Sequence, residues 1–484
     1  MHSFSNMASI DLPSVFILLL VITIFISFFL RRKKKTLNFP PGSSGWPIVG
    51  ETLDFLRANR EGKPEKFVED RIEKYKSKIF KTSIMGENVV VIGGAGGNKF
   101  LFSNENKKVN VWWPVTIRKL LGPCLITSVG EEAKLMRKML SYFISPDAFS
   151  RLYTKTMEVV ALDHVDKYWE GKEQVKVYHL LKLYTFKVAC QLFMSIEDHN
   201  EIEKLSTLFN IFLKGLIAIP VNLPGTTFHK ATRAVVTIRK ELLQIVRKRR
   251  EALEQKTASP SQDILSHLLS FPDENGKFMS ELVIVNNILL LLFAGHDTST
   301  VALTLLIKRL GEHPQVYENI LQEHIKIASA KKEGESLNWD DIQKMKYSWN
   351  VLCEATRLKQ PIIGAYREAI VDINYEGYHM PKGWKFYWNT TLTSLDPEYF
   401  PNATSFDPSR FEGAGPAPFS YIAFGGGPRM CIGKEFARLE MLVFLHIIVR
   451  KFRWKLVVPD ERIIYDPMAT PVEGLPISLQ NHKP

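Results

Sequence analysis

The stretch FGGGPRMCIG, residues 424–433, places a single cysteine, Cys431, in a glycine-rich loop directly before a long helical pattern. Glycine leaves the backbone bare, so a large flat group can come close to the sulfur. The free amides at the start of the helix predicted over 434–452 and the charge of Arg429 favour a thiolate, the form of cysteine that binds metals. The alternative is an inert buried cysteine; a cysteine hydrolase is disfavoured because the stretch lacks a histidine.

The complete pattern FxxGxRxCxG is formed by Phe424, Gly427, Arg429, Cys431 and Gly433. It resembles the signature of the haem-thiolate monooxygenases, the cytochrome P-450 superfamily. The resemblance implies that Cys431 is the axial ligand of the iron of haem b, that Arg429 contacts a haem propionate, and that Phe424 packs beside the sulfur. Gly433 completes this cofactor-binding loop. O2 is the implied co-substrate, since a thiolate ligand favours cleavage of the O–O bond.

A second motif, AGHDTST at 294–300, lies inside the apolar helical pattern over 281–310. Asp297 and Thr298 are poor choices for a helix interior, because both compete for backbone hydrogen bonds. One interpretation is a buried, satisfied polar pair in an ordinary packing site. The other is a catalytic acid–alcohol pair, which resembles the family motif [AG]Gx[DE]T[TS]. The resemblance implies that Thr298 holds a water or the dioxygen and that Asp297 relays protons, whereas His296 receives no role.

A third motif pairs Glu354 with Arg357, three residues apart on a predicted helix. A surface ion pair of this spacing contributes only about 0.3 kcal/mol. The alternative is a buried pair joined by Arg410 from the stretch FDPSRFE at 406–412. This resembles the family's ExxR and PxRF elements, which brace the core beside the haem. We interpret all three residues as structural, because the planar guanidinium can serve a carboxylate and backbone oxygens together.

Two positions depart from the family pattern. The usual Trp-x-x-x-Arg that touches a propionate is represented here by Arg137 with Ala133 four residues before it. Arg137 is nevertheless our candidate for a second haem contact. The usual Pro-Pro after the ExxR helix is replaced by Gln360-Pro361, which changes the loop expected to border the substrate pocket.

Charge and cysteine content exclude several classes of protein. The 484 residues carry a net charge of +12, and the four cysteines lie too far apart for zinc pairs or a disulfide scaffold. No pattern typical of nucleic-acid binding is present. The stretch GGAGGN at 93–98 lacks dinucleotide-loop spacing, and no nicotinamide or flavin site is visible. We therefore predict that electrons come from NADPH through a partner reductase with an acidic docking face.

The N-terminal segment predicts a membrane anchor. Residues 12–30 are uncharged and long enough to cross the ~30 Å hydrocarbon layer, and the cluster RRKKK at 31–35 follows. Positive charge at this end keeps the rest of the chain cytosolic, on the endoplasmic reticulum membrane, with a short lumenal stretch at 1–11. A cleaved signal peptide is the alternative. The sequons at Asn389 and Asn402 are then predicted to be bare.

The remaining chain is predicted as a basic, Pro/Gly-rich linker at 31–50 followed by one domain over 51–484. Its fold class is mainly α with a small β portion, the cytochrome P-450 fold. The run at 288–295 is too short for a second span and is interpreted as a core helix. A hairpin is predicted over 78–94 and two further strands over 372–388. Helices are predicted near 131–145, 176–195, 201–217, 234–255, 281–310, 339–359 and 434–452.

A finer resemblance runs from about residue 40 to near the C-terminus, in stretches such as VWWP and DPSRFEGAGPAPF. These are similar to plant triterpenoid oxidases of the β-amyrin 28-oxidase type, which implies stepwise oxidation of a triterpene methyl, C-28, to an acid. Other triterpene positions and taxane-type diterpenes stay open as substrates. A hydroperoxide-rearranging haem enzyme and a non-catalytic membrane lipid sensor are the rival functions. The apolar stretch at 211–225 is interpreted either as a membrane contact or as core.

Overall fold

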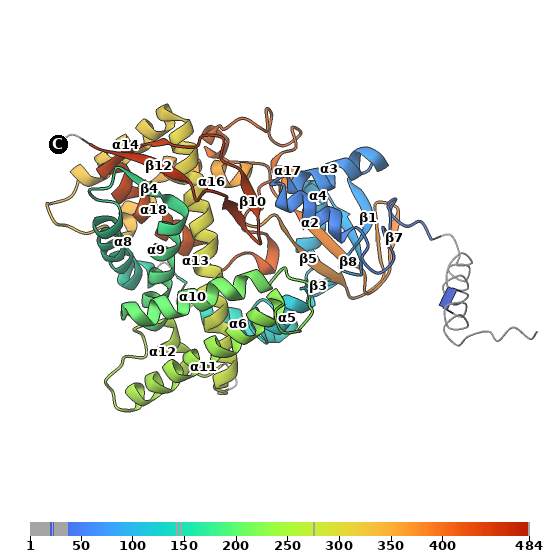
Figure 1. The fold of residues 1–484 in the computed structure, drawn as a ribbon, viewed down its shortest axis with the longest axis horizontal. Helices are drawn as coiled ribbons and strands as arrows, with labels where there is room; N and C mark the ends of the chain where they lie inside the picture. Colours follow the sequence, from blue (N-terminus) through green and yellow to red (C-terminus); the bar gives the residue numbers. More distant parts are fainter. Residues whose placement is uncertain are drawn as a thin grey trace, which may run out of the picture.

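The molecule combines a large helical portion with a smaller, sheet-rich portion that also carries the N-terminal helices (Figure 1). This computed structural model confirms the predicted mainly α class with a small β part. The predicted anchor lies almost entirely outside the residues that the structure describes, so it stays a prediction. The described residues are 20, 21, 23, 37–141, 144–145, 148–273 and 276–482.

All seven predicted helical stretches contain helices, whereas others such as α8 and α14 were not predicted; each helix buries one stripe or its whole surface. Their bounds are α2 Thr52–Arg60, α3 Pro64–Tyr75, α4 Gly94–Ser103, α5 Val115–Leu121, α6 Gly130–Ser141, α8 Thr154–Tyr168, α9 Val177–Met194, α10 His199–Gly215, α11 Thr227–Glu254, α12 Ile264–Ser270, α13 Glu281–Glu312, α14 Pro314–Ser329, α15 Trp339–Lys344, α16 Lys346–Leu358, α17 Thr391–Ser394 and α18 Lys434–Lys451. Three further turns are η2 Phe149–Tyr153, η3 Pro408–Phe411 and η4 Gly427–Arg429.

Two helix predictions were wrong in their bounds. The single helix predicted over 339–359 is two helices, α15 and α16, because Met345 between them has a non-helical ψ of 54°. A capping box of Asn338 and Asp341 starts α15. Helix α11 begins seven residues earlier than predicted, because the Thr226 side chain accepts a hydrogen bond from the His229 amide and caps it.

The main sheet has five strands in the order β1-β2-β8-β5-β3, and only the β2–β8 pair is parallel. The hairpin predicted over 78–94 is confirmed as β1 and β2. The stretch 372–388 was predicted as two strands, but the chain forms the small hairpin β6–β7 there and then enters the main sheet as β8. The strands of these sheets are β1 Ile79–Ile84, β2 Glu87–Ile92, β3 Val109–Trp112, β5 Gly364–Ala369, β6 Ile373–Tyr375, β7 Tyr378–Met380 and β8 Lys385–Asn389.

Two smaller sheets close the C-terminal part of the chain. One has the order β4-β12-β9, so the C-terminal strand pairs with the strand that precedes α9. The other is the pair β10–β11. Their strands are β4 Gln174–Lys176, β9 Phe452–Leu456, β10 Ile463–Tyr465, β11 Ala469–Pro471 and β12 Pro476–Asn481.

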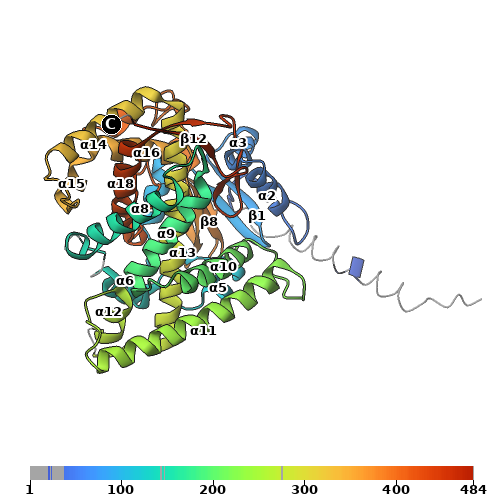
Figure 2. The same cartoon turned by 60° about the vertical axis from the view of Figure 1, so that its left-hand side comes forward.

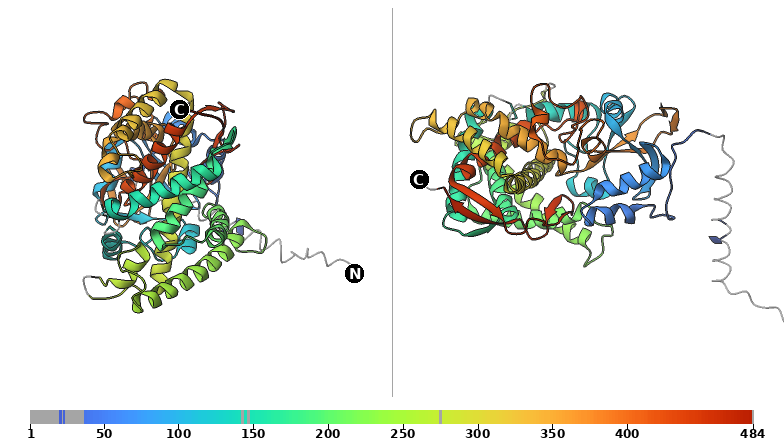
Figure 3. Two further views of the ribbon diagram at one scale, coloured as in Figure 1. Left: turned by 90° about the vertical axis from the view of Figure 1, so that its left-hand side faces the viewer. Right: turned by 90° about the horizontal axis from the view of Figure 1, so that it is seen from above.

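Helix α13 passes through the middle of the molecule, with α9 and α18 alongside it and α11 along one edge (Figure 2). Seen from above, α13 lies end-on among the other helices (Figure 3). It has the length and hydropathy of a membrane span, the one such helix among the described residues, but its apolar stretch is 78% buried by the protein. The prediction that 288–295 belongs to a core helix is confirmed.

Candidate active site

The loop that carries Cys431 is held closed by its own backbone. The Cys431 amide donates to the carbonyl of Phe424 at 2.9 Å, and Gly433 stands at the N-cap of α18. Gly427 has φ of +63°, and a Cβ there would lie 2.5 Å from the carbonyl oxygen of Phe102 in α4. Close packing on Phe102, and not only approach of a flat ligand, therefore requires glycine in this loop.

Cys431 is the one exposed cysteine; Cys124, Cys190 and Cys353 are buried. Burial raises the pKa of the Cys431 thiol, while the Gly433 amide and the charge of Arg137 act to lower it. The sequence led us to expect that the surroundings alone favour a thiolate. This is wrong, because desolvation, which raises the pKa, outweighs the groups that lower it. An accessible thiol in a crowded site suits a metal ligand, because coordination deprotonates a thiol outright.

Arg429 is hydrogen-bonded to the connection between α5 and α6. Its Nη1 and Nη2 donate to the carbonyls of Leu125 and Ser128 at 3.1 and 2.6 Å. Its Nε lies 3.4 Å from the carboxylate of Glu105. The guanidinium is thus held in place beside the cysteine loop by groups from other parts of the chain.

Two more arginines join Arg429 near this loop. Arg137 donates from Nη2 to the carbonyl of Met430 at 2.7 Å, which brings this candidate next to Cys431 without the tryptophan that the family usually has. Arg367 on β5, which sequence reasoning missed, donates from Nε to Glu105 at 2.6 Å. Burial lowers the pKa of all three arginines, so keeping three positive charges at this place is unfavourable for folding.

This cluster fits the cofactor that the sequence implies. Among the residues that the structure describes, Arg367 and Arg429 share one carboxylate, Glu105, whereas Arg137 donates to the Met430 carbonyl and has no carboxylate partner. An excess of positive charge in a partly buried site calls for anionic groups. The two propionates of haem are anions of this kind, and the accessible Cys431 thiol is a group that would ligate its iron.

On α13 the predicted acid and alcohol point in different directions. The Thr298 hydroxyl donates back to the carbonyl of Ala294 at 2.8 Å, whereas Asp297 Oδ1 lies 3.0 Å from Lys182 Nζ on α9. The other oxygen of Asp297 lies 3.3 Å from Nε2 of His296. No hydrogen bond joins Asp297 to Thr298 in the described chain. His296, to which the sequence assigned no role, therefore contacts the acid directly.

One stretch of α13 is open although its neighbours are buried. Ala294 is exposed and Thr298 is half-buried, between buried turns on either side. At Gly295, a Cβ would lie 3.1 Å from the ring of Phe193 and 4.0 Å from that of Phe436, so the first turn of α18 packs against this point of α13. Thr298 thus lies on an accessible face of the helix that meets the start of α18.

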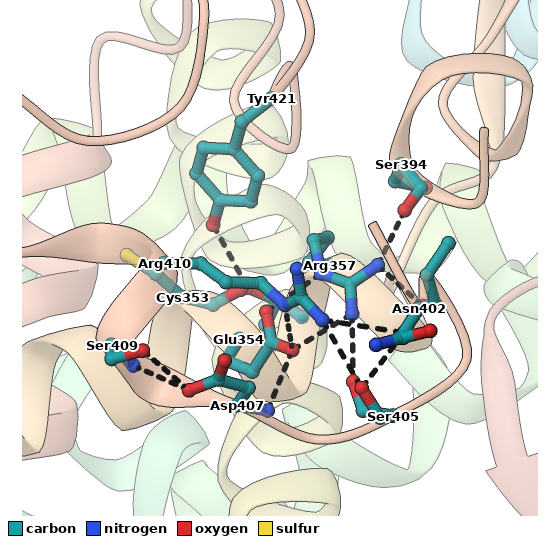
Figure 4. Close-up of polar contacts among 12 residues, drawn as sticks. Cys353, Glu354, Arg357, Ser394, Asn402, Ser405, Asp407, Ser409, Arg410 and Tyr421 are labelled. Atoms are coloured by element: carbon teal, nitrogen blue, oxygen red, sulfur yellow. Dashed lines mark hydrogen bonds and ion pairs between the residues drawn. The ribbon is translucent and has the colours of Figure 1, made fainter. Parts of the chain in front are cut away.

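The Glu354–Arg357 pair is fully buried, so the surface interpretation was wrong (Figure 4). The two side chains form a bidentate pair, with N–O distances of 2.6 and 2.7 Å. Arg357 also donates to the carbonyls of Ser394, Ala403 and Ser405. These carbonyls belong to the long connection from β8 towards the cysteine loop, so the pair ties α16 to that connection.

Arg410 joins this pair, as the sequence predicted. Its Nε lies 3.5 Å from Glu354 Oε1, and its Nη2 donates to the Asn402 carbonyl and the Ser405 hydroxyl. The Asp407 amide donates to the same Glu354 oxygen at 3.0 Å. Glu354 is therefore surrounded by donors, and the cluster is complete without any ligand.

A helical body built around one long buried helix, with a thiol open to a ligand among arginines, defines the class of haem-thiolate monooxygenases. The Cytochrome P450 family profile matches residues 40–477. The chain belongs to the cytochrome P450 family. It therefore binds haem, uses O2, and takes electrons from NADPH through a reductase.

Comparison with individual proteins gives the same family. The chain is 52% identical to a beta-amyrin 28-monooxygenase of Medicago truncatula, over 96% of this chain and 98% of that protein. It is 52% identical to a protein of the same name from Vitis vinifera, over 92% and 93%. Among solved structures it is similar to retinoic acid-bound cyanobacterial CYP120A1, with a TM-score of 0.84 and 34% identity over 93% of this chain and all of that one.

Proposed function

We propose that this protein oxidises C-28 of a pentacyclic triterpene of the β-amyrin type. The observation that carries the proposal is the near full-length similarity to two enzymes named for that reaction. The taxane-type and lipid-sensor alternatives receive no support from these relatives. The acid and alcohol of α13, which a hydroperoxide-rearranging enzyme does not need, also favour oxygenation.

In this proposal Cys431 ligates the haem iron, with Phe424 and Gly433 flanking the sulfur. Arg429 and Arg137 bind the propionates, since both guanidiniums lie at the cysteine loop. Haem held by a thiolate supplies the activation of O2. The protein's part is to orient the cofactor through these arginines and to keep the sulfur next to the Gly433 amide.

Thr298 and Asp297 are proposed to handle protons. The Thr298 hydroxyl already donates to Ala294, so its lone pairs are free to accept a hydrogen bond from a water on the accessible face of α13. Asp297 is held by Lys182, whose side chain is 18% exposed and thus reaches solvent. A turn of the Asp297 side chain away from Lys182 would carry a proton from the solvent side towards Thr298.

We propose that the domain sits on the endoplasmic reticulum membrane through the 12–30 anchor. Two exposed apolar segments support a second contact with the bilayer. In the linker, Trp46 and Ile48 are 78% and 93% exposed; after α10, Ile219 and Leu223 are 73% and 62% exposed. Substituting Ile219 and Leu223 with aspartate should weaken binding of an anchor-deleted chain to liposomes. Unchanged binding would contradict a membrane contact at this segment.

The topology can be checked at the sequon of Asn402. Asn389 is 1% exposed and cannot report on topology, whereas Asn402 is exposed. A cytosolic domain leaves Asn402 bare, so a glycosidase should not change the mobility of the full-length chain on a gel. A shift that Asn402→Gln abolishes would place the domain in the lumen.

The substrate is tested in yeast microsomes that contain the full-length chain and a plant reductase. β-Amyrin, α-amyrin, lupeol and a taxane precursor are supplied separately with NADPH, and products are identified by mass spectrometry. We expect the C-28 alcohol, aldehyde and acid from β-amyrin. Product from the taxane precursor alone, or β-amyrin oxidised at another carbon, would overturn the proposal. Turnover should also fall as salt rises if basic residues dock the reductase.

The role of Thr298 is tested by Thr298→Ala in the same microsomes. Groups that assist proton transfer contribute about 100-fold or more, so oxygenated product should fall strongly while NADPH is diverted to hydrogen peroxide. Ser299→Ala is the matched control, because Ser299 also bonds back to the preceding turn but is buried. Equal yields from both variants would contradict the proposed role.

A further inference from the structure

A buried carboxylate outside the catalytic and cofactor motifs connects two of the arginines at the cysteine loop. Glu105 lies between α4 and β3 and is 4% exposed. Its Oε2 accepts a hydrogen bond from Arg367 Nε at 2.6 Å, and its Oε1 accepts one from the Val111 amide at 3.1 Å. Oε1 also lies 3.4 Å from Arg429 Nε. One carboxylate thus holds two guanidiniums and is itself held by the backbone.

Both arginines use only their Nε on Glu105, which leaves the outer nitrogens for other partners. Arg429 gives one bond from each outer nitrogen to a backbone carbonyl, and Arg367 gives one bond to a carbonyl. A guanidinium has five N–H groups. Within the described chain, each arginine therefore keeps at least two N–H groups for an anion.

The charges explain why Glu105 is needed. Burial is the largest cause that lowers the pKa of both guanidiniums, and the charge of Arg429 lowers the pKa of Arg367 further. Glu105 opposes this effect in both. Without it, two desolvated cations would repel each other and turn away from a common direction.

We propose that Glu105 is a positioning residue for the cofactor: a fixed counter-charge that orders Arg367 and Arg429 towards the propionates and so sets haem retention and reduction potential. Glu105 leaves two of the three positive charges of the cluster unbalanced, which matches two propionates. The inference concerns the cofactor side of the protein and goes beyond the proposed triterpene reaction, so it stands or falls independently of the substrate.

Two variants separate charge from orientation. Glu105→Gln keeps the shape and an acceptor oxygen but removes the charge, so the added electron of ferrous haem is better stabilised and the reduction potential becomes more positive. Glu105→Ala also frees both arginines. Loss of a residue that orients a cofactor's ligands typically costs 10-fold or more in affinity, so haem should leave about tenfold faster.

The test uses the full-length haem-loaded protein in lipid nanodiscs. The haem-loss rate is measured by transfer to apomyoglobin, the potential by redox titration, and stability by thermal unfolding. Asp263→Asn is the matched control. Asp263 is fully buried, accepts a hydrogen bond from the Ser266 amide and pairs with Arg249, away from the cysteine loop.

We expect Asp263→Asn to lower the melting temperature with wild-type haem loss and potential. The Glu105 variants should change both haem properties in the directions given. If they behave like the control, Glu105 only braces the fold and the proposal is overturned. If Glu105→Ala does not fold, Glu105→Gln decides alone: a wild-type potential in that variant refutes the proposal.

Discussion

Two clusters of arginine and glutamate serve the region around Cys431, and they differ in how their charges balance. On α16 and η3, Arg357 and Arg410 face Glu354 and Asp407, and three backbone carbonyls take further N–H groups of Arg357. The two cations are balanced by two carboxylates, and all five N–H groups of Arg357 have acceptors within the protein. Such a cluster has nothing left to offer a ligand, so its role is structural.

The second cluster stays open. In the described part of the chain Arg367 and Arg429 share Glu105, Arg137 contacts the Met430 carbonyl without a carboxylate partner, and outer N–H groups are still free. A protein retains such an excess of buried charge only where something else supplies the balance. The number of unbalanced charges therefore distinguishes a structural cluster from a ligand site, although both clusters consist of the same residue types.

The largest expected effect comes from opening the closed cluster. Glu354→Ala leaves Arg357 buried without its carboxylate, which should cost about 3–5 kcal/mol of the free energy of unfolding. Chemical denaturation of the purified chain measures this. The control is Glu318→Ala, whose exposed pair with Arg453 should be worth less than about 1 kcal/mol. Equal losses in the two variants would mean that the buried cluster is not a brace.

A smaller effect on folding is expected from the open cluster. Arg137→Ala removes one hydrogen bond to the Met430 carbonyl, so the apoprotein should lose no more than about 1.5 kcal/mol. Haem loss should nevertheless speed up about tenfold, because the proposed contact of Arg137 with a propionate would be removed. Lys134→Ala, one turn earlier on α6 and exposed, is the control and should leave haem loss unchanged. A large loss of apoprotein stability with an unchanged rate of haem loss would mean that Arg137 has a structural role and does not bind the cofactor.

The last prediction concerns a pH dependence and tests a buried carboxyl group, that of Glu440, for which the described chain shows no paired cation. Glu440 on α18 is fully buried, and burial raises its pKa well above 4.5, while a hydrogen bond from the Ser299 side chain acts to lower it. The folded protein keeps this proton while the unfolded chain releases it above about 4.5. The contribution of Glu440 to stability therefore falls as pH rises above about 4.5, by up to ~1.4 kcal/mol per pH unit.

Glu440→Gln carries no titrating group, so it should be near wild-type stability below pH 4.5 and more stable than wild type above it. The stability difference is measured by denaturation from pH 4.5 to 8. A stability difference that does not change with pH would mean that Glu440 is ionised in the folded protein and that a positive charge nearby balances it.

Local patterns predicted the strongly apolar elements but not helices such as α8 and α14, and contacts between distant residues were harder still to predict. The hairpin β1–β2 and helix α13 follow from alternation and apolar length. The break at Met345 does not, because the residues on both sides are helix formers and only the local ψ separates α15 from α16. The orientation of Asp297 towards Lys182 was also out of reach, since these residues are far apart in the chain.

The sequence by itself determined the chemistry of this protein, because the spacing around Cys431, the Asp297–Thr298 pair and the Glu354–Arg357 pair are local patterns with a physical cause. Only the tertiary structure decided which charges meet. Glu105 and Arg367 are 262 positions apart, and no short pattern marks either of them. Folding of the sheet against the cysteine loop brings them together. Because both charges are desolvated there, each would be strongly unfavourable without the other.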